Sequence, residues 1–238
     1  MTFNWNYMLS LLSDVDFWQA TWTVIKLSLL TWAFSIVLGF ILALAKQSPR
    51  KLFNAPARLY IWLFRSVPLL VLVVFVYNLP QLFPATGGIL GNAFIAGLLA
   101  TVLVETAYMA EIHRGGLISV ARGQHEAGHA LGFGYLGIQR LVVIPQALRI
   151  ALPALINEFI TIVKQTSLVS VISLAEILLV GQRLYTQNFL VFETMLAVAV
   201  YYVLIVTFFD KMLVDGSTLS RAIHYPAMDL APDAPHVW

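Results

Sequence analysis

The chain has 238 residues, of which 60% are apolar and only 11% are charged, and its formal net charge is +2. A soluble domain carries roughly 25% charged residues, so this chain has too few to cover a water-exposed surface. The composition therefore excludes a soluble enzyme, and the nearly neutral charge excludes nucleic acid as a partner. The absence of cysteine excludes disulfides and thiolate metal sites.

The N-terminal half predicts three membrane-spanning helices, because a span needs about 20 mostly apolar residues. Residues 21–45 form the first such segment. Residues 66–104 contain no Asp, Glu, Lys or Arg, and this run is too long for one helix across a hydrocarbon core of about 30 Å. Pro80 and the prolines and glycines that follow it interrupt the run. We therefore expect two crossings here, at 60–77 and 89–110.

The C-terminal half predicts two further crossings. One is the apolar segment 191–209, and the other is one of two shorter segments, 148–163 and 168–180, each of which contains a glutamate. We expect the first of these to cross and the second to lie at the outer surface. Lysines and arginines, which favour the cytoplasmic side, cluster after the first, third and last crossings. Five crossings, with the N-terminus outside and the C-terminus in the cytoplasm, satisfy this distribution, and the fold class is an all-α membrane protein.

The predicted domain organisation is a transmembrane domain over residues 1–214, followed by a cytoplasmic tail over 215–238. Prolines and aspartates near the chain end favour a flexible tail. The third and fourth crossings are separated by an insertion at about 115–145, whose apolar residues recur at helical spacing. This insertion predicts a helical hairpin outside the membrane. The alternative is an amphipathic linker that lies on the lipid surface.

The insertion contains a recognisable motif. Residues 123–128 read Gly-Gln-His-Glu-Ala-Gly, and they are followed by Gly132 and by a Val-Val-Ile-Pro run that ends at Pro145. This pattern resembles the EAA loop of bacterial ATP-binding-cassette (ABC) importer permeases, with Gly128 in place of the second alanine. Further blocks at 64–70, 107–116 and 164–168 resemble the polar amino acid branch of these permeases. The last block departs from Lys-Asp-Thr-Ser-Leu by having Gln165 as its second residue.

The resemblance implies the five-helix fold of type I importer permeases, with a cytoplasmic coupling helix, in the bacterial inner membrane. It also implies a subunit that moves a polar amino acid only together with partners. These are a second permease chain, the same or homologous, two cytoplasmic subunits that bind ATP and Mg²⁺, and an extracytoplasmic amino-acid-binding protein. The chain has no phosphate-binding GxxxxGK[ST] loop, so we expect no enzyme activity in the chain itself. The expected coupling residues are Glu126, Ala127, Gly128, Gly132 and Pro145.

A competing motif occupies the same segment, because His125-Glu126-Ala127-Gly128-His129 also satisfies the zinc-binding pattern H-E-x-x-H. The alternative function is thus an intramembrane zinc metalloprotease. A catalytic zinc needs a third protein ligand, and the nearest spare histidine, His113, has no spacing that supports the role. We therefore expect no bound metal. A passive channel is a third possibility, but it gives no reason for a glycine-flanked cytoplasmic helix.

Glutamates within the predicted spans are costly in lipid and mark either a transport pathway or a structural ion pair. Glu111 precedes Arg114 by three residues, which predicts a pair at the helix end. Glu105 and Glu158 lie deeper, and either carboxylate could accept the ammonium group of an amino acid or belong to a structural pair. Backbone amides freed beside Pro68 or Pro153 could donate to the substrate carboxylate. The predicted substrate-contacting residues are Pro68, Glu105, Tyr108, Asn157 and Glu158.

Overall fold

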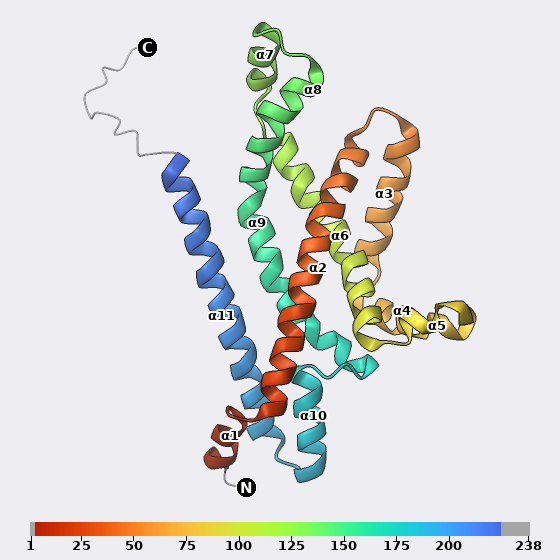
Figure 1. Cartoon of the computed structure of the whole chain (residues 1–238), viewed down its shortest axis with the longest axis vertical. Coiled ribbons are helices and arrows are strands. Elements are labelled where there is room, and N and C mark those ends of the chain that lie inside the picture. Colours follow the sequence, from red (N-terminus) through yellow and green to blue (C-terminus); the bar gives the residue numbers. More distant parts are fainter. Residues whose placement is uncertain (1–2, 225–238) are drawn as a thin grey trace, which may run out of the picture.

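The computed structural model describes residues 3–224, with side chains as far as Met212, and the regular secondary structure of this part of the chain is entirely helical (Figure 1). Its elements are α1 (Trp5–Leu11), α2 (Val15–Gln47), α3 (Lys51–Ser66), α4 (Leu69–Leu82), η1 (Pro84–Thr86), α5 (Gly87–Leu90), α6 (Ala93–Ile118), α7 (Arg122–Ala130), α8 (Tyr135–Ile138), η2 (Gln139–Val143), α9 (Ile144–Gln165), η3 (Thr166–Ile172), α10 (Ile177–Asn188) and α11 (Val191–His224).

The centre of the molecule is a bundle in which α2, α6 and α9 pack side by side and α11 packs against α9. Small residues allow α2 and α6 to approach closely, as is common between membrane helices. A Cβ atom added at Gly39 would lie 2.6 Å from the Cβ atom of Met109. One part of the same interface is polar, since the hydroxyls of Thr31 and Thr101 share a hydrogen bond of 2.8 Å. The bundle therefore depends on a glycine contact and a buried hydroxyl pair as well as on apolar packing.

Four helical segments are long and apolar enough to cross a membrane, namely Val15–Gln47, Ala93–Ile118, Tyr135–Ile172 and Val191–Met212. A fifth span is counted if α3 and α4 are taken together, although these helices meet at an angle of 105°. The predicted number of crossings and the all-α class agree with this architecture.

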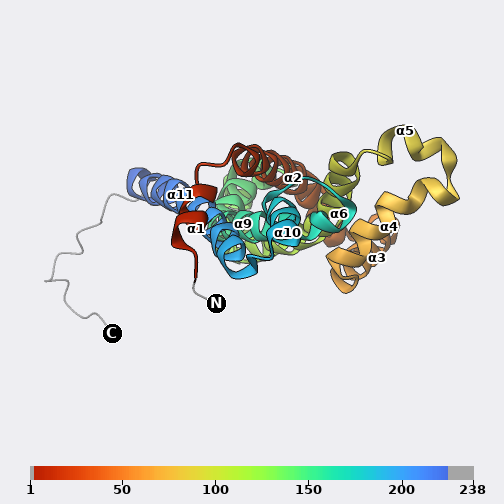
Figure 2. The same cartoon turned by 90° about the horizontal axis from the view of Figure 1, so that it is seen from below.

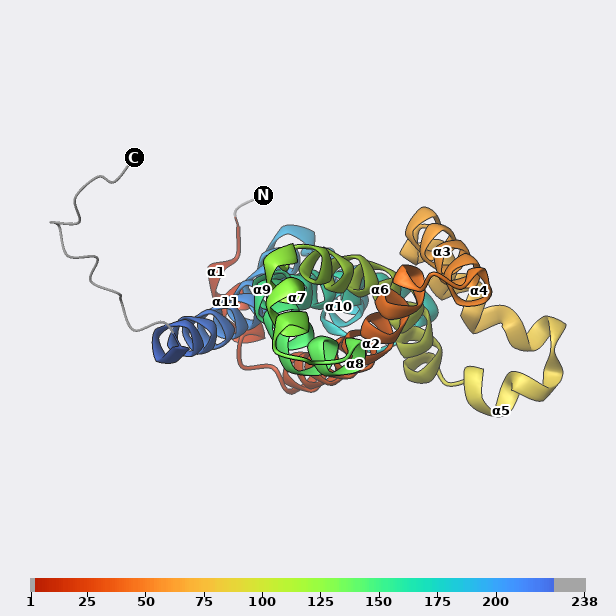
Figure 3. The same cartoon turned by 90° about the horizontal axis from the view of Figure 1, so that it is seen from above.

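The crossing expected at 60–77 is corrected by the structure, because it is a bent pair and not one helix. The chain turns at Val67 and Pro68, ahead of the prolines and glycines that we expected to interrupt the apolar run. Pro68 has no amide hydrogen, and the ring of a proline disfavours helical backbone at the preceding residue. Val67 is accordingly extended, with φ −86° and ψ 127°. As a result, α4 and α5 project sideways from the bundle (Figures 1 and 3).

The two ends of the bundle carry different structures. The insertion, with α7 and α8, forms one end, and α1 and α10 lie together at the other (Figures 1 and 2). The segment predicted as an outer element at 168–180 comprises most of η3 and the beginning of α10. The last helix continues past the predicted domain boundary at Val214 as far as His224. The rest of the predicted tail, residues 225–238, lies outside the described residues.

The end with α10 is fixed by hydrogen bonds among the terminal helices. The Glu176 carboxylate accepts the backbone N–H groups of Leu178 and Leu179 at the start of α10, at 2.8 and 2.7 Å. The Tyr202 hydroxyl of α11 donates to the same carboxylate at 2.7 Å. Glu176 is fully buried, so its satisfied hydrogen bonds explain why a glutamate is tolerated there. We assign it a structural role.

Candidate functional site

The middle of α6 contains a buried carboxylate to which no group of the described protein donates a hydrogen bond. Glu105 is fully buried, with 0% of its surface exposed, and neither of its carboxylate oxygens has a hydrogen-bond partner. The neighbouring polar side chains are those of Glu158 and Gln165, both on α9. Gln165 also has a buried amide oxygen without a partner. Because unsatisfied buried polar groups are costly, this cluster is the first candidate for a ligand site.

The structure brings together only some of the predicted substrate-contacting residues. Glu105 and Glu158, from different helices, share the cluster. Tyr108 is half-buried one helical turn along α6, and Pro68 is exposed at the N-cap position, immediately before α4. Asn157 is exposed on α9, one position before Glu158. The cluster is therefore built mainly by α6 and α9.

Two residues were missed in the sequence analysis. Gln165 was noted only as a departure from a motif, yet its side chain interacts with Glu105. Arg65, within the block at 64–70, places its guanidinium carbon 5.3 Å from the centroid of the Tyr108 ring. In both cases the motif match drew attention to the right segment. It gave no sign of which neighbouring helix the side chain would face.

The Glu111 pair was predicted and is confirmed. The Glu111 carboxylate forms a salt bridge with the Arg114 guanidinium at 2.9 Å. It also pairs with the Lys46 ammonium at the end of α2, a contact that the sequence did not indicate. The three groups therefore connect the last turns of α2 and α6, which is a structural role.

The predicted coupling residues on α7 differ in their exposure. Glu126 and Ala127 are exposed on α7, whereas Gly128 is buried. A Cβ atom at Gly128 would lie 2.8 Å from the Cγ1 atom of Ile138 on α8. Close packing between α7 and α8 therefore explains why a glycine stands where the EAA pattern has its second alanine.

The turn between α7 and α8 and the beginning of α9 also depend on special residues. Gly132 has φ +80°, a backbone conformation that glycine adopts without the strain a side chain would add. Pro145 lies in the first turn of α9, where a missing N–H removes no helical hydrogen bond. The five-residue π-helix η2 joins α8 to α9. These local features shape the connections that join α7, α8 and α9.

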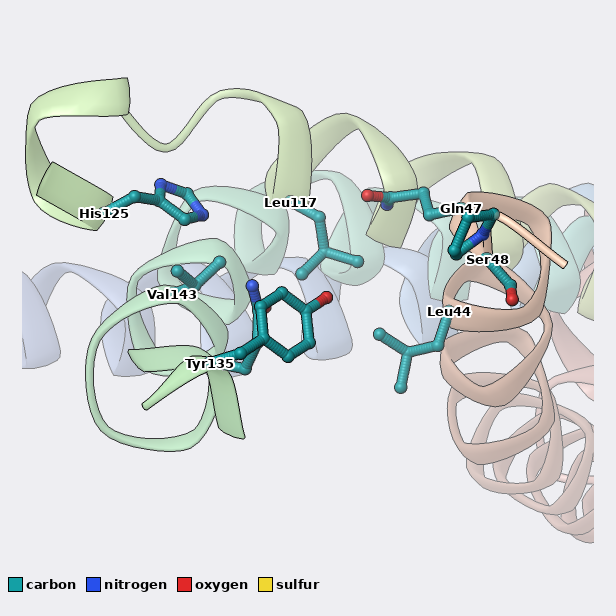
Figure 4. Close-up of a pocket in the computed structure, with 9 residues that line it drawn as sticks. Leu44, Gln47, Ser48, Leu117, His125, Tyr135 and Val143 are labelled. Carbon is teal, nitrogen blue, oxygen red and sulfur yellow. The ribbon is translucent and has the colours of Figure 1, made fainter. Parts of the chain in front are cut away.

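A cavity of about 360 Å³ separates the insertion from the end of α2 (Figure 4). The side chains of His125, Tyr135 and Val143 enter it from the insertion, and Leu44 and Gln47 line its other side. His125 therefore turns toward the cavity. The second histidine of the zinc-like motif, His129, is exposed on α7.

The zinc alternative receives no support from this geometry. No group of three or more His, Cys, Asp or Glu side chains that could hold a metal ion occurs among the described residues. His113, the spare histidine considered as a third ligand, is buried against α2, and its Nε2 atom lies 3.1 Å from the carbonyl oxygen of Ile36. The backbone contact explains this histidine without a metal.

A bundle of membrane helices with a buried polar cluster, and with a short exposed helix held at one end by glycine packing, fits a permease component of an ABC importer. The chain matches the family described as binding-protein-dependent transport system inner membrane component over residues 35–213. It belongs to this family.

Relatives and a solved structure agree with that assignment. The chain is 39% identical over 205 residues to the probable amino-acid ABC transporter permease protein PatM of Vibrio harveyi, which covers 85% of this chain and 89% of the relative. It is 35% identical over 200 residues to the glutamine transport system permease protein GlnP of Escherichia coli, covering 79% of this chain and 90% of GlnP. One solved structure that the chain resembles is described as an amino acid ABC transporter with histidines. It superposes with a TM-score of 0.83 at 32% identity over 92% of this chain and 99% of that one.

Proposed function

We propose that the chain is the permease subunit through which an importer moves a polar amino acid into a bacterial cell. The observation that supports this substrate is the Glu105 carboxylate, which is fully buried without a hydrogen-bond partner beside Glu158 and Gln165. An ammonium group would satisfy it, since charge-assisted hydrogen bonds are stronger than neutral ones. The names of PatM, GlnP and the solved amino acid transporter support the same class of substrate.

The proposed substrate site combines the carboxylates with groups around them. Glu105 and Glu158 would accept from the ammonium group. Tyr108 and Asn157 would contact the rest of the molecule. At the bend, Pro68 begins α4, and the first amides of a helix lack internal partners, so this helix start could donate to anionic or carbonyl groups. The arrangement suits an amino acid because it provides both acceptors and donors.

The energy for transport would come from partner subunits. The exposed Glu126 and Ala127 of α7 suit docking into a groove of a cytoplasmic ATP-binding subunit, in the manner of a helix that inserts into a partner. Two such subunits would hold ATP and Mg²⁺, since this chain has no phosphate-binding loop of its own. A second permease chain and an extracytoplasmic amino-acid-binding protein would complete the importer.

The proposed orientation places the insertion in the cytoplasm and the α1 and α10 end outside the inner membrane. The distribution of basic residues supports it, because Lys46, Arg50 and Lys51 cluster near the α2–α3 connection. Large apolar side chains along α2 are exposed, including Phe34, Val37 and Ile41. Lipid or a second permease chain would cover them.

The substrate assignment is tested by uptake into proteoliposomes that contain the assembled importer and its binding protein, with a panel of labelled amino acids. We expect Glu105→Gln and Glu158→Gln each to reduce uptake of the preferred amino acid strongly while the complex still assembles. Thr186→Ala, a change at an exposed position of α10, is the matched control and should transport normally. Normal uptake by both glutamate variants would contradict the proposed site, and failure to transport any amino acid would contradict the proposed substrate class.

A further inference from the structure

Arg65 is a cation at the level of the bundle centre. It lies in the last turn of α3, immediately before the bend at Val67 and Pro68. Its guanidinium carbon is 5.3 Å from the ring centroid of Tyr108, a residue near the midpoint of α6, which spans Ala93–Ile118. A charged side chain at such a depth is costly unless it faces protein or a polar path and has a partner.

Within the described residues, Arg65 has an aromatic contact but no salt bridge. An aromatic ring stabilises a guanidinium stacked on it by about 0.5–2 kcal/mol. It accepts no hydrogen bond from the five guanidinium N–H groups, which point outward in the guanidinium plane. The salt bridges within the described residues both involve Glu111, so no described carboxylate is paired with Arg65. Its side chain is exposed, and its N–H groups are accessible to a ligand.

Tyr108 lies between Arg65, which its ring contacts, and Glu105, which is three residues away on the same helix. Glu105 and Tyr108 are three residues apart on α6, so they are neighbours on one side of that helix. Glu105 therefore lies one helical turn from the ring that holds the guanidinium. The cluster at α6 and α9 offers acceptors and no cation, whereas Arg65 offers only donors.

An amino acid has complementary groups, because its ammonium and its carboxylate are attached to the same carbon. The geometry points to Arg65 as the residue that binds the α-carboxylate of the transported amino acid, with the Tyr108 ring holding the guanidinium in place. The planar guanidinium can donate two parallel hydrogen bonds to a carboxylate, which a lysine cannot reproduce. This inference rests on the proposed amino-acid substrate and adds the group that recognises its carboxylate.

The experiment measures direct binding by calorimetry to the complex of permease and ATP-binding subunits in nanodiscs, without the binding protein, which would select ligands first. The probes are glutamine, histidine and arginine, each compared with its α-carboxamide, in which the carboxylate is neutral. The wild-type complex should bind the preferred free amino acid about tenfold or more tightly than its amide. Arg65→Gln should weaken binding of the free amino acid by about ten- to a hundredfold and leave amide binding nearly unchanged.

The controls separate recognition from stability. Arg58→Gln removes another exposed arginine from α3 and should keep wild-type discrimination between acid and amide. Arg65→Lys should show an intermediate preference for the free acid, because it retains the charge without the paired geometry. If Arg65→Gln weakened acid and amide equally, or if the wild-type complex bound both equally, the role of Arg65 would be overturned.

Failure of the proposed function has a different signature. If Glu105→Gln abolished amino acid binding while Arg65→Gln kept full preference for the free acid, the substrate site would stand and Arg65 would have no part in it. If no member of the panel bound the wild-type complex, the amino-acid substrate and the role of Arg65 would both be overturned.

Discussion

Two glutamates in this permease have opposite surroundings. Glu105 is fully buried in α6 without a hydrogen-bond partner, whereas Glu126 is exposed on α7. The buried carboxylate is available only to a group that enters the bundle. The exposed one is available to a protein that docks from outside. On the proposed function, the first would take part in substrate recognition within the membrane and the second in coupling at its surface.

The two regions also differ in what holds them in shape. The central bundle is held by long packed helices, with Gly39 set closely against Met109. The insertion consists of short helices, and its shape depends on a few backbone features, among them the positive φ of Gly132 and the close contact of Gly128 with Ile138. Substitutions in the insertion should therefore change coupling before they change the fold of the bundle.

The largest expected effect is loss of coupling when the insertion is altered. Glu126→Ala removes the exposed carboxylate, and Gly132→Val places a branched side chain at a positive φ, where a side chain is strained. Both variants should assemble but lose at least about tenfold in uptake rate, the equivalent of about 1.4 kcal/mol of activation free energy. Uptake and stimulated ATP hydrolysis in proteoliposomes measure this effect. Normal coupled transport by both variants would contradict a coupling role for the insertion.

The next largest effect concerns substrate charge in the buried region. A site with two carboxylates should favour neutral polar or cationic amino acids over aspartate and glutamate, because opposite charges attract more strongly where water is scarce. Gln165→Asp adds a third carboxylate beside Glu105 and should shift the preference further toward cations, by about tenfold. Gln165→Asn keeps the amide and is the control.

Competition uptake between arginine, glutamine and glutamate measures this preference. Preferred transport of glutamate or aspartate, unaffected by Glu105→Gln and Glu158→Gln, would show that these carboxylates do not set the charge of the substrate.

Much of the fold could be predicted because a bilayer imposes length and polarity on each span. The apolar segments predicted the spans later found as α2, α6 and α11, since about 20 apolar residues are needed to cross. The bend at Pro68 was not predicted as the break in the second span. A proline in an apolar run is compatible with a kinked helix or with two helices, and the sequence alone does not decide between them.

The candidate site was only partly predictable. The cost of a charge in lipid identified Glu105 and Glu158 as residues that face the bundle interior. The same argument could not pair Glu105 with Gln165, because an amide carries no charge that requires an explanation. Arg65 was missed for another reason, since its relation to Tyr108 depends on how α3 packs across α6.

A smaller effect is expected from the contact inside the insertion. Gly128→Ala would place a methyl group 2.8 Å from the Ile138 side chain, so either this side chain or the two helices must shift. We expect a fall of about two- to fivefold in stimulated ATP hydrolysis, because overpacking typically costs about 1–3 kcal/mol and part of it can be relieved by movement.

The control for that prediction is the double variant Gly128→Ala with Ile138→Ala, which removes the Cγ1 atom that the new methyl group would meet. It should restore part of the lost coupling, and Ile138→Ala alone measures the cost of losing that side chain. If Gly128→Ala coupled normally without the second substitution, the close packing of α7 against α8 would have no role in coupling.

The smallest expected effect lies between the two regions, at the ion pairs that join α2 to α6. Glu111 pairs with Lys46 and Arg114, and all three side chains remain partly exposed, with 18–33% of their surface accessible. Solvent screens such pairs, which contribute about 0–1 kcal/mol each. Glu111→Gln should therefore lower the thermal midpoint of the purified complex only slightly and leave substrate preference unchanged. A loss of transport comparable to that of Glu126→Ala, at normal assembly, would instead place Glu111 in the path between the insertion and the buried site.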